Sequence, residues 1–238
     1  MRFAILGDIH GNLPALEAAY GAAVSHGAEK IYHLGDLGGY APFINEVADF
    51  VIGHGIEGVQ GNYDESVGYD HPHCGCRAED PLHDEMMGKG FAWTKARATE
   101  KTKEYLRGLP AVILFACEGL MVSLFHATPS KNNLYWTSDR DDGFFMKMAA
   151  KADADVMVYG HTHIAYRKDI GGKVFINAGS VGKPKDRDAR SCVVIIDIAA
   201  GRVETEFLRA AYDVREVASA IVENGLPGYF AERLIEGR

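Results

Sequence analysis

Asp, Asn and His residues recur in this sequence in short groups, most of which directly follow a glycine. Asp8 and His10 stand two positions apart, and His161 and His163 repeat that spacing late in the chain. Imidazole nitrogens together with carboxylate and amide oxygens form sites for divalent metal ions. The candidate ligands are Asp8, His10, Asp36, Asn62, His126, His161 and His163. We interpret these side chains as one metal centre.

The elements that must position these side chains are short apolar runs with the length of buried strands. The runs cover residues 3–6, 30–34, 56–60, 120–125 and 155–159. They lead into Asp8, Asp36, Asn62, His126 and His161. The first three runs alternate with predicted helices, which is typical of a parallel α/β sheet. Because functional groups collect beyond the carboxyl ends of such strands, we expect all five strand ends to meet.

The rest of the chain is predicted to complete a single domain over residues 1–238. Further strands are expected at 111–116, 165–169, 173–177, 192–198 and 202–208, and helices at 12–26, 42–52, 143–151 and over the last 25 or so residues. Residues 65–108 hold no convincing strand, and we interpret them as an inserted helical cap over the site. Gly88 and Gly90 suggest an interruption in its helix.

Each group taken alone has a simpler interpretation as a polar turn. Glycine and asparagine adopt left-handed turn conformations readily, so Gly35-Asp36 or Gly61-Asn62 could be such a turn. Five separate predicted strands, however, are each followed by a side chain that could bind a metal ion. The stability of a fold requires no such coincidence, and the joint pattern therefore favours a functional site.

The order of these groups resembles that of the calcineurin-like metallophosphoesterase superfamily. The matching blocks are Asp8-x-His10, Gly35-Asp36, Gly61-Asn62-x-Asp64, His126 and Gly160-His161-x-His163. They cover the chain to about residue 200, and the Asn-Ala-Gly-Ser-Val-Gly segment at 177–182 resembles the small bacterial and archaeal phosphodiesterase branch. The resemblance implies a four-layer α/β/β/α sandwich with two mixed sheets and the metals at a sheet edge.

The resemblance also implies how the ligands divide between two ions. One ion would be held by Asp8, His10, Asp36 and His163, and the other by Asp36, Asn62, His126 and His161. A carboxylate suits the bridging role of Asp36 because it has two oxygens and a full negative charge. Asp64 is expected to orient its neighbours rather than to bind metal. Mixed imidazole and oxygen ligands favour manganese or iron and leave zinc or nickel open.

Two such ions, about 3.5–4 Å apart, would acidify a bridging water and clamp phosphate oxygens during in-line attack. We therefore predict an enzyme that hydrolyses phosphoester bonds in small phosphorylated substrates, most simply a phosphodiesterase. A dinucleoside polyphosphate or other nucleotide hydrolase and a phosphomonoesterase are the alternatives. A non-catalytic scaffold, as in the retromer subunit that resembles this family, is disfavoured because all seven ligands are present. The expected catalytic residues are Asp36, Asn62, Tyr63, His126 and Asp64.

Tyr63 is the main departure from the family pattern. The commonest third block is Gly-Asn-His followed by an acidic residue, and its His is thought to protonate the leaving oxygen. Tyr63 occupies that position here. A tyrosine can donate a proton, but its ordinary pKa near 10 is a poor match to neutral pH. The substitution argues against a protein Ser/Thr phosphatase and leaves the general acid open, with His33 as another candidate.

Other polar residues have two interpretations. A zinc clip or an ordinary cap loop would account for His71, His73, Cys74 and Cys76, and the loop is preferred because no second ligand pair is evident. Phosphate contact or a solvated surface would account for Asn132, Asn133, Arg140, Lys183, Lys185, Arg187 and Arg190. Cys117 and Cys192 are expected to be buried in strands, and His26, His54 and His83 to be solvated.

Bulk composition limits the partners. The content of 47% hydrophobic and 24% charged residues is that of a globular protein. A net charge of -8 argues against binding to long nucleic acids, which usually requires a basic surface. No apolar run reaches the roughly 18 residues of a membrane span. With four cysteines and no export signal, a cytoplasmic protein is expected.

Overall fold

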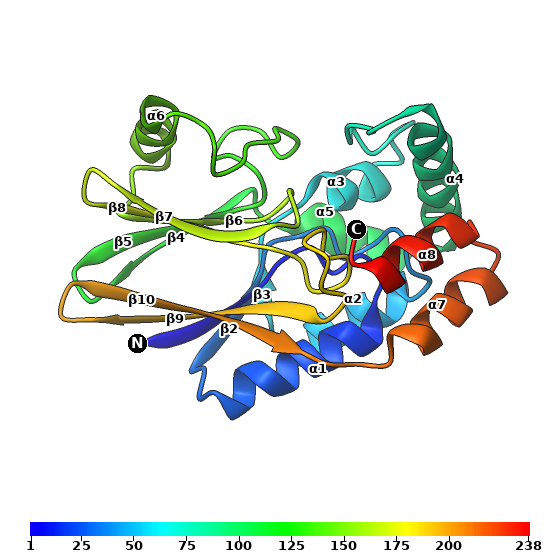
Figure 1. The fold of residues 1–238 in the computed structure, drawn as a ribbon, viewed down its shortest axis with the longest axis horizontal. Coiled ribbons are helices and arrows are strands. Elements are labelled where there is room, and N and C mark those ends of the chain that lie inside the picture. The colour runs from blue at the N-terminus through cyan, green and yellow to red at the C-terminus, as the bar shows by residue number, and fades with distance from the viewer.

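The computed structural model describes residues 1–238 and contains two five-stranded sheets that lie face to face (Figure 1). The first sheet has the order β10-β9-β1-β2-β3, with β1 (Arg2–Leu6), β2 (Lys30–His33), β3 (Glu57–Gly58), β9 (Ser191–Ala199) and β10 (Arg202–Ala210). The second has the order β4-β5-β6-β8-β7, with β4 (Val112–Cys117), β5 (Leu120–Phe125), β6 (Val156–Tyr159), β7 (Ala165–Ile170) and β8 (Lys173–Ala178).

The central strands are apolar throughout because both of their faces are buried. In β1, Phe3 and Ile5 point into the core between the sheets, whereas Ala4 and Leu6 face the helices outside the first sheet. Strands with two buried faces read as continuous apolar runs, which is why the sequence reveals them. The predicted strand at 56–60 is shorter than expected, since only Glu57 and Gly58 pair with β2.

Helices cover the outer faces of both sheets and complete four layers (Figure 1). Helices α1 (Leu13–Ser25) and α2 (Ile44–Gly53) pack on the first sheet, and α6 (Asp142–Ala152) packs on the second. The Asn12 side chain starts α1 by accepting a hydrogen bond from the Ala15 amide at 3.2 Å. The predicted α/β/β/α sandwich with two mixed sheets is confirmed.

The predicted cap region is helical. It contains the end of α3 (Asn62–Gly68) and all of α4 (Pro81–Arg97) and α5 (Glu100–Gly108), and these helices lie beside the sandwich near the C-terminal helices α7 (Val214–Glu223) and α8 (Gly228–Glu236) (Figure 1). The expected interruption at Gly88 and Gly90 is wrong, because α4 runs through both. A side chain at Gly90 would meet the Phe230 ring at 2.6 Å, so this glycine allows α8 to approach. The chain breaks instead at Ala98, which is extended.

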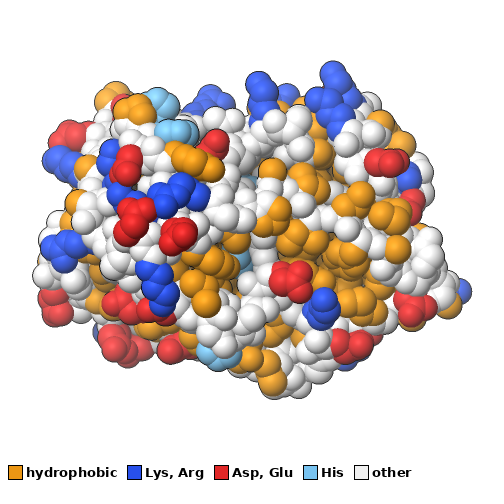
Figure 2. All heavy atoms as spheres, turned by 180° about the vertical axis from the view of Figure 1, so that it is seen from behind, with side chains coloured by type: hydrophobic (Ala, Val, Ile, Leu, Met, Phe, Trp, Pro, Cys, Tyr) orange, Lys and Arg blue, Asp and Glu red, His pale blue; other side chains and the backbone are white.

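The sheet pairing explains why ligands from distant sequence positions can meet. β1, β2 and β3 pair in parallel, and so do β5, β6 and β8 in the other sheet. Their carboxyl ends open at one edge of the sandwich. None of the helices combines the length and apolarity that crossing a bilayer requires. On the face seen from behind in Figure 2, basic side chains are interspersed with acidic ones.

Candidate metal centre

The strand ends bring the predicted ligands into two buried groups. The first contains Asp8, His10 and His163, and the second contains Asp36, His126 and His161. Within each group the potential ligand atoms lie within 4.8 Å of one another. Asn62 joins the second group through its Oδ1, which is 3.0 Å from His126 Nε2. The structure thus brings together all seven side chains, and none is more than 5% exposed.

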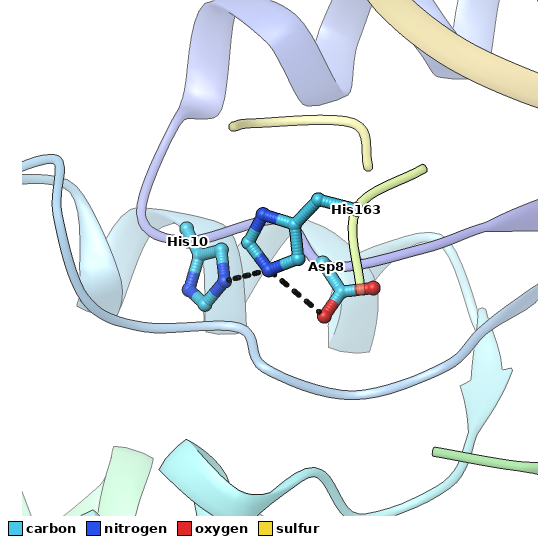
Figure 3. Close-up of side chains that lie close together, drawn as sticks. All are labelled: Asp8, His10 and His163. Atoms are coloured by element: carbon cyan, nitrogen blue, oxygen red, sulfur yellow. Dashed lines mark hydrogen bonds and ion pairs between the residues drawn. The ribbon is translucent and has the colours of Figure 1, made fainter. Parts of the chain in front are cut away.

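In the first group, His163 lies between His10 and Asp8 (Figure 3). The Nδ1 of His10 lies 2.8 Å from the Gly38 carbonyl oxygen, and the Nδ1 of His163 lies 2.6 Å from that of Lys183. Each Nδ1 therefore carries the proton it donates, and each Nε2 presents a lone pair. The two Nε2 atoms face each other at 3.1 Å. Two lone pairs at this distance repel, and a shared cation removes the repulsion.

The second group shows the same convergence of acceptors. His126 Nδ1 donates to the Leu34 carbonyl oxygen at 2.7 Å, which leaves the lone pair on Nε2. The Asn62 amide nitrogen donates to the Cys74 carbonyl oxygen at 2.9 Å, which turns its Oδ1 toward His126 Nε2. Two acceptors again lie about a hydrogen-bond length apart without a proton between them. The donor set of both groups therefore fits divalent cations.

Asp36, a member of the second group, also lies close to the first. Its Oδ2 is 3.8 Å from His10 Nε2 in one group and 3.6 Å from His126 Nε2 in the other. Its Oδ1 accepts a hydrogen bond from the Tyr63 amide at 2.8 Å, which fixes the orientation of the carboxylate. This position is the one that a bridging ligand needs.

Asp64 holds the loops that carry Asp36 and Asn62. Its carboxylate accepts hydrogen bonds from the amides of Asp36 at 2.8 Å, Leu37 at 2.8 Å and Gly61 at 2.9 Å. These three bonds connect the end of β2 to the start of α3. Asp64 thereby holds the loops of Asp36 and Asn62 without being part of either group.

The backbone around the ligands is strained and crowded. Positive φ angles occur at Asp8 (40°), His10 (51°), Asp36 (52°), His161 (67°) and His163 (61°). Such angles are unusual for residues with side chains and concentrate at functional sites. A Cβ atom at Gly61 would lie 2.2 Å from Asp36 Oδ1, and one at Gly160 would lie 2.3 Å from Asp8 Oδ2. The glycines beside the ligands thus make room for the neighbouring carboxylates.

Burial shifts the pKa values of both kinds of ligand toward their neutral forms. It raises the pKa of Asp36 to about 7 and raises that of Asp8 well above its usual range, with the nearby Asp36 charge adding to the latter effect. It lowers the pKa of His126 to about 4 and those of His10 and His163 well below the usual value. Neutral imidazoles are ready to bind metal, and the carboxylates are stabilised as anions when cations lie beside them.

The end of β8 and the segment that follows it connect the other strand ends. Asn177 donates from its amide nitrogen to the Gly160 carbonyl oxygen at 2.9 Å, next to His161. Ser180 donates from its hydroxyl to the Asp8 carbonyl oxygen at 2.7 Å. The sequence motif at 177–182 suggested the phosphodiesterase branch but not these contacts. Its function in the structure is to position ligands.

The two cap cysteines lie closer to the ligands than expected. In addition to the Cys74 carbonyl contact, the Asn62 amide nitrogen lies 3.2 Å from Cys76 Sγ. His71 and His73 are exposed and belong to neither ligand group. The segment is therefore a loop, as preferred from the sequence, but it also orients the side chain of Asn62.

The candidates for phosphate contact differ in their exposure to solvent and in their distance from the metal centre. Asn132 and Asn133 line a pocket of about 450 Å³ that reaches His126, together with Gln60, Glu65 and Thr128. Arg140, Arg187 and Arg190 are exposed. Lys183 is only 3% exposed, so the solvated interpretation is wrong for it.

His83 was also expected to be solvated, but it is buried against Tyr229 of α8. Cys117 and Cys192 are buried as predicted.

Tyr63 and His33 are both buried. The Tyr63 ring packs between His10, Tyr40 and Phe91, and its hydroxyl has no hydrogen-bond partner. Burial raises the pKa of this hydroxyl well above 10, which makes it a weaker acid. His33 accepts a hydrogen bond from the Gly35 amide, and burial lowers its pKa to about 3. Neither environment favours proton donation at neutral pH.

Two sheets thus present buried Asp, Asn and His side chains at one edge, where they could hold metal ions. The sequence model of the calcineurin-like phosphoesterase superfamily domain matches residues 1–201. The chain therefore belongs to the calcineurin-like phosphoesterase superfamily, and the resemblance drawn from its motifs is confirmed.

Three proteins match nearly the whole chain. An uncharacterized protein of Methanocaldococcus jannaschii is 29% identical over 252 aligned positions, which cover 99% of this chain and 98% of that protein. The crystal structure of a metallophosphoesterase from Sphaerobacter thermophilus matches with a TM-score of 0.79 and 26% identity over all of both chains. A hypothetical protein from Pyrococcus horikoshii has the same fold, with a TM-score of 0.85, 21% identity and coverage of 100% and 98%.

Proposed function

We propose that this protein hydrolyses phosphodiester bonds in small phosphorylated substrates with two divalent cations at the strand ends. The observation that carries the proposal is the pair of acceptor clusters on either side of Asp36. The first cation would be held by Asp8, His10, Asp36 and His163. The second would be held by Asp36, Asn62, His126 and His161.

When bound, two such cations supply the Lewis acidity that activates water and neutralises charge on the phosphate oxygens. The protein supplies their geometry. Nδ1 hydrogen bonds fix the rings of His10, His126 and His163, so that each Nε2 points inward. Asp64 holds the loops of Asp36 and Asn62 in place. The buried positions exclude bulk water, which strengthens each electrostatic contact.

The polar pocket beside His126 supports a diester substrate. A diester carries a second organic group beyond the phosphate, and that group needs space next to the metals. The pocket has a volume of about 450 Å³, within the range of ordinary ligand sites, and its lining includes Asn132 and Asn133. Polar side chains of this kind suit a sugar or a base better than an aliphatic chain.

The ligand set favours manganese or iron, because imidazole and oxygen donors are mixed and the thiols of Cys74 and Cys76 belong to neither group. We further propose a cytoplasmic location, since all four cysteines are free thiols.

A substrate panel tests the function. Metal-free protein reconstituted with Mn²⁺, Fe²⁺, Zn²⁺ or Ni²⁺ is assayed on a nitrophenyl diester, a nitrophenyl monoester and a dinucleoside polyphosphate. We expect the diester to have the highest kcat/KM and the metal-free protein to be inactive. Faster hydrolysis of the monoester or of the polyphosphate would replace the proposal with one of those activities.

A further inference from the structure

The side chain of Lys183 is a buried cation without a partner. It is 3% exposed, and its Nζ makes no hydrogen bond. The Nζ lies 3.8 Å from the centre of the Tyr40 ring, a cation–π contact that stabilises the charge only in part. The Tyr40 ring in turn lies 4.7 Å from the His10 ring. An unpaired ammonium is thus held beside the ligands of the first metal group.

Lys185 adds a second positive charge at the same place. Both lysines are attached to His163 through the backbone, because His163 Nδ1 bonds to the Lys183 carbonyl oxygen and the Lys185 amide bonds to the His163 carbonyl oxygen at 3.2 Å. Lys185 is only partly buried, so this side of the cluster opens to solvent. These main-chain contacts therefore place both lysines beside His163.

Glu79, an acidic residue near this cluster, is already paired. Glu79 of the cap binds Arg233 of α8 through both carboxylate oxygens at 2.9 Å. Burial, together with the positive charges of Lys185 and Arg233, holds the pKa of Lys183 well below its ordinary value, so its charged form is disfavoured unless an anion lies beside it. The Glu79–Arg233 pair is neutral as a unit, so it supplies no net negative charge to the two lysines.

Resting on the proposed function, we propose that Lys183 and Lys185 bind a second phosphate group of the substrate, apart from the phosphodiester that is cleaved. A phosphate monoester, with a charge of about −1.5 to −2 at neutral pH, would supply the negative charge that these two lysines lack. The cleaved diester already has the two cations to neutralise it. The substrate class is therefore a small phosphodiester that also carries a terminal phosphate.

Two substrates that differ only in this group test the proposal. Thymidine 5′-nitrophenyl phosphate and its 3′-phosphorylated counterpart have the same scissile bond and leaving group. Charge-assisted hydrogen bonds correspond to about a tenfold to hundredfold change in affinity. We expect the wild-type Mn²⁺ enzyme to have a KM lower by about this factor for the 3′-phosphorylated substrate. Lys183→Met should remove the difference and change the KM for the other substrate by less than about twofold.

Arg190→Met is the matched control, because Arg190 lies in the same loop, is exposed and is paired with Asp188. It should leave both KM values unchanged. Circular dichroism checks the fold, and if Lys183→Met does not fold, Lys185→Met takes its place in the test. Calorimetry with thymidine 3′,5′-bisphosphate and thymidine 5′-phosphate measures the same preference without turnover.

Equal KM values in the wild type, or equal changes in both substrates with Lys183→Met, would overturn the second phosphate site. Failure to hydrolyse either substrate would overturn the proposed diesterase activity instead. In that case the calorimetric preference still decides whether the lysines bind a phosphate group.

Discussion

The metal-binding edge and the cap are built in different ways. At the edge, ligands follow directly from paired strands, and five of them have positive φ angles. The cap reaches the same site through one irregular loop, in which Cys74 and Cys76 contact Asn62. Backbone hydrogen bonds within the sheets hold the strand ends in place, whereas the cap loop orients only the side-chain amide of Asn62. We therefore propose that metal binding depends on the strand ends and that the helical segment at 65–108 adjusts it.

The bridging position of Asp36 predicts the largest effect. Asp36→Ala removes the carboxylate that lies between both groups, so both ions should bind more weakly. We expect activity to fall by more than the roughly 10–100-fold that loss of an outer partner causes. Metal analysis and kcat/KM on a nitrophenyl diester measure the effect. Asp36→Asn keeps the shape and serves as the partner variant; normal turnover in both would rule out the dinuclear arrangement.

The three amide contacts of Asp64 predict the next largest effect. Asp64→Asn replaces one acceptor oxygen with a donor, so at least one of the Asp36, Leu37 and Gly61 amides loses its partner. Metal affinity should fall about 10–100-fold, and unfolding should require about 1–3 kcal/mol less free energy. Metal titration and urea unfolding test this. Wild-type values for both would show that Asp64 does not position the ligands.

The cap contact predicts a smaller effect. In Cys76→Ala the Asn62 amide still donates to the Cys74 carbonyl oxygen, so we expect the affinity for the second ion to fall by less than about tenfold. Cys117→Ala, remote in a strand of the second sheet, is the control. If Cys76→Ala lost a whole ion per chain, the thiol would be a ligand and the cap would be part of the metal centre.

Tyr63 predicts the smallest effect. Its hydroxyl is buried and unpartnered, so Tyr63→Phe should change kcat by no more than about twofold for nitrophenyl and alkyl esters alike. Rates are compared on both substrate classes. A selective loss of about 10²–10⁴-fold on alkyl esters would instead assign the proton to Tyr63.

The strand ends could be predicted from the sequence because their signals are local. An apolar run, a glycine and a ligand-type residue stand next to one another at Gly35-Asp36 and Gly160-His161. Both glycines are required by crowding, because a Cβ atom at Gly35 would lie 2.3 Å from the Gly61 amide nitrogen and one at Gly160 would lie 2.3 Å from Asp8 Oδ2. Because the same glycines that mark these strand ends in the sequence are needed for packing in the fold, the positions of the strand ends could be predicted.

The errors concern residues whose surroundings come from distant parts of the chain. Lys183 looks solvated among charged neighbours, but the fold places it under the Tyr40 ring. Gly90 looks like a helix break, but Phe230 of α8 packs against it and the helix continues. His83 is buried by the same C-terminal region. No periodicity near these residues could reveal contacts made more than a hundred positions away.

Anomalous diffraction from crystals of the Mn²⁺-loaded protein tests the central claim most directly. We predict two manganese peaks about 3.5–4 Å apart, one beside Asp8, His10 and His163 and the other beside Asn62, His126 and His161, with Asp36 between them. A single peak, or a peak held by the thiols of Cys74 and Cys76, would contradict a dinuclear centre at the strand ends.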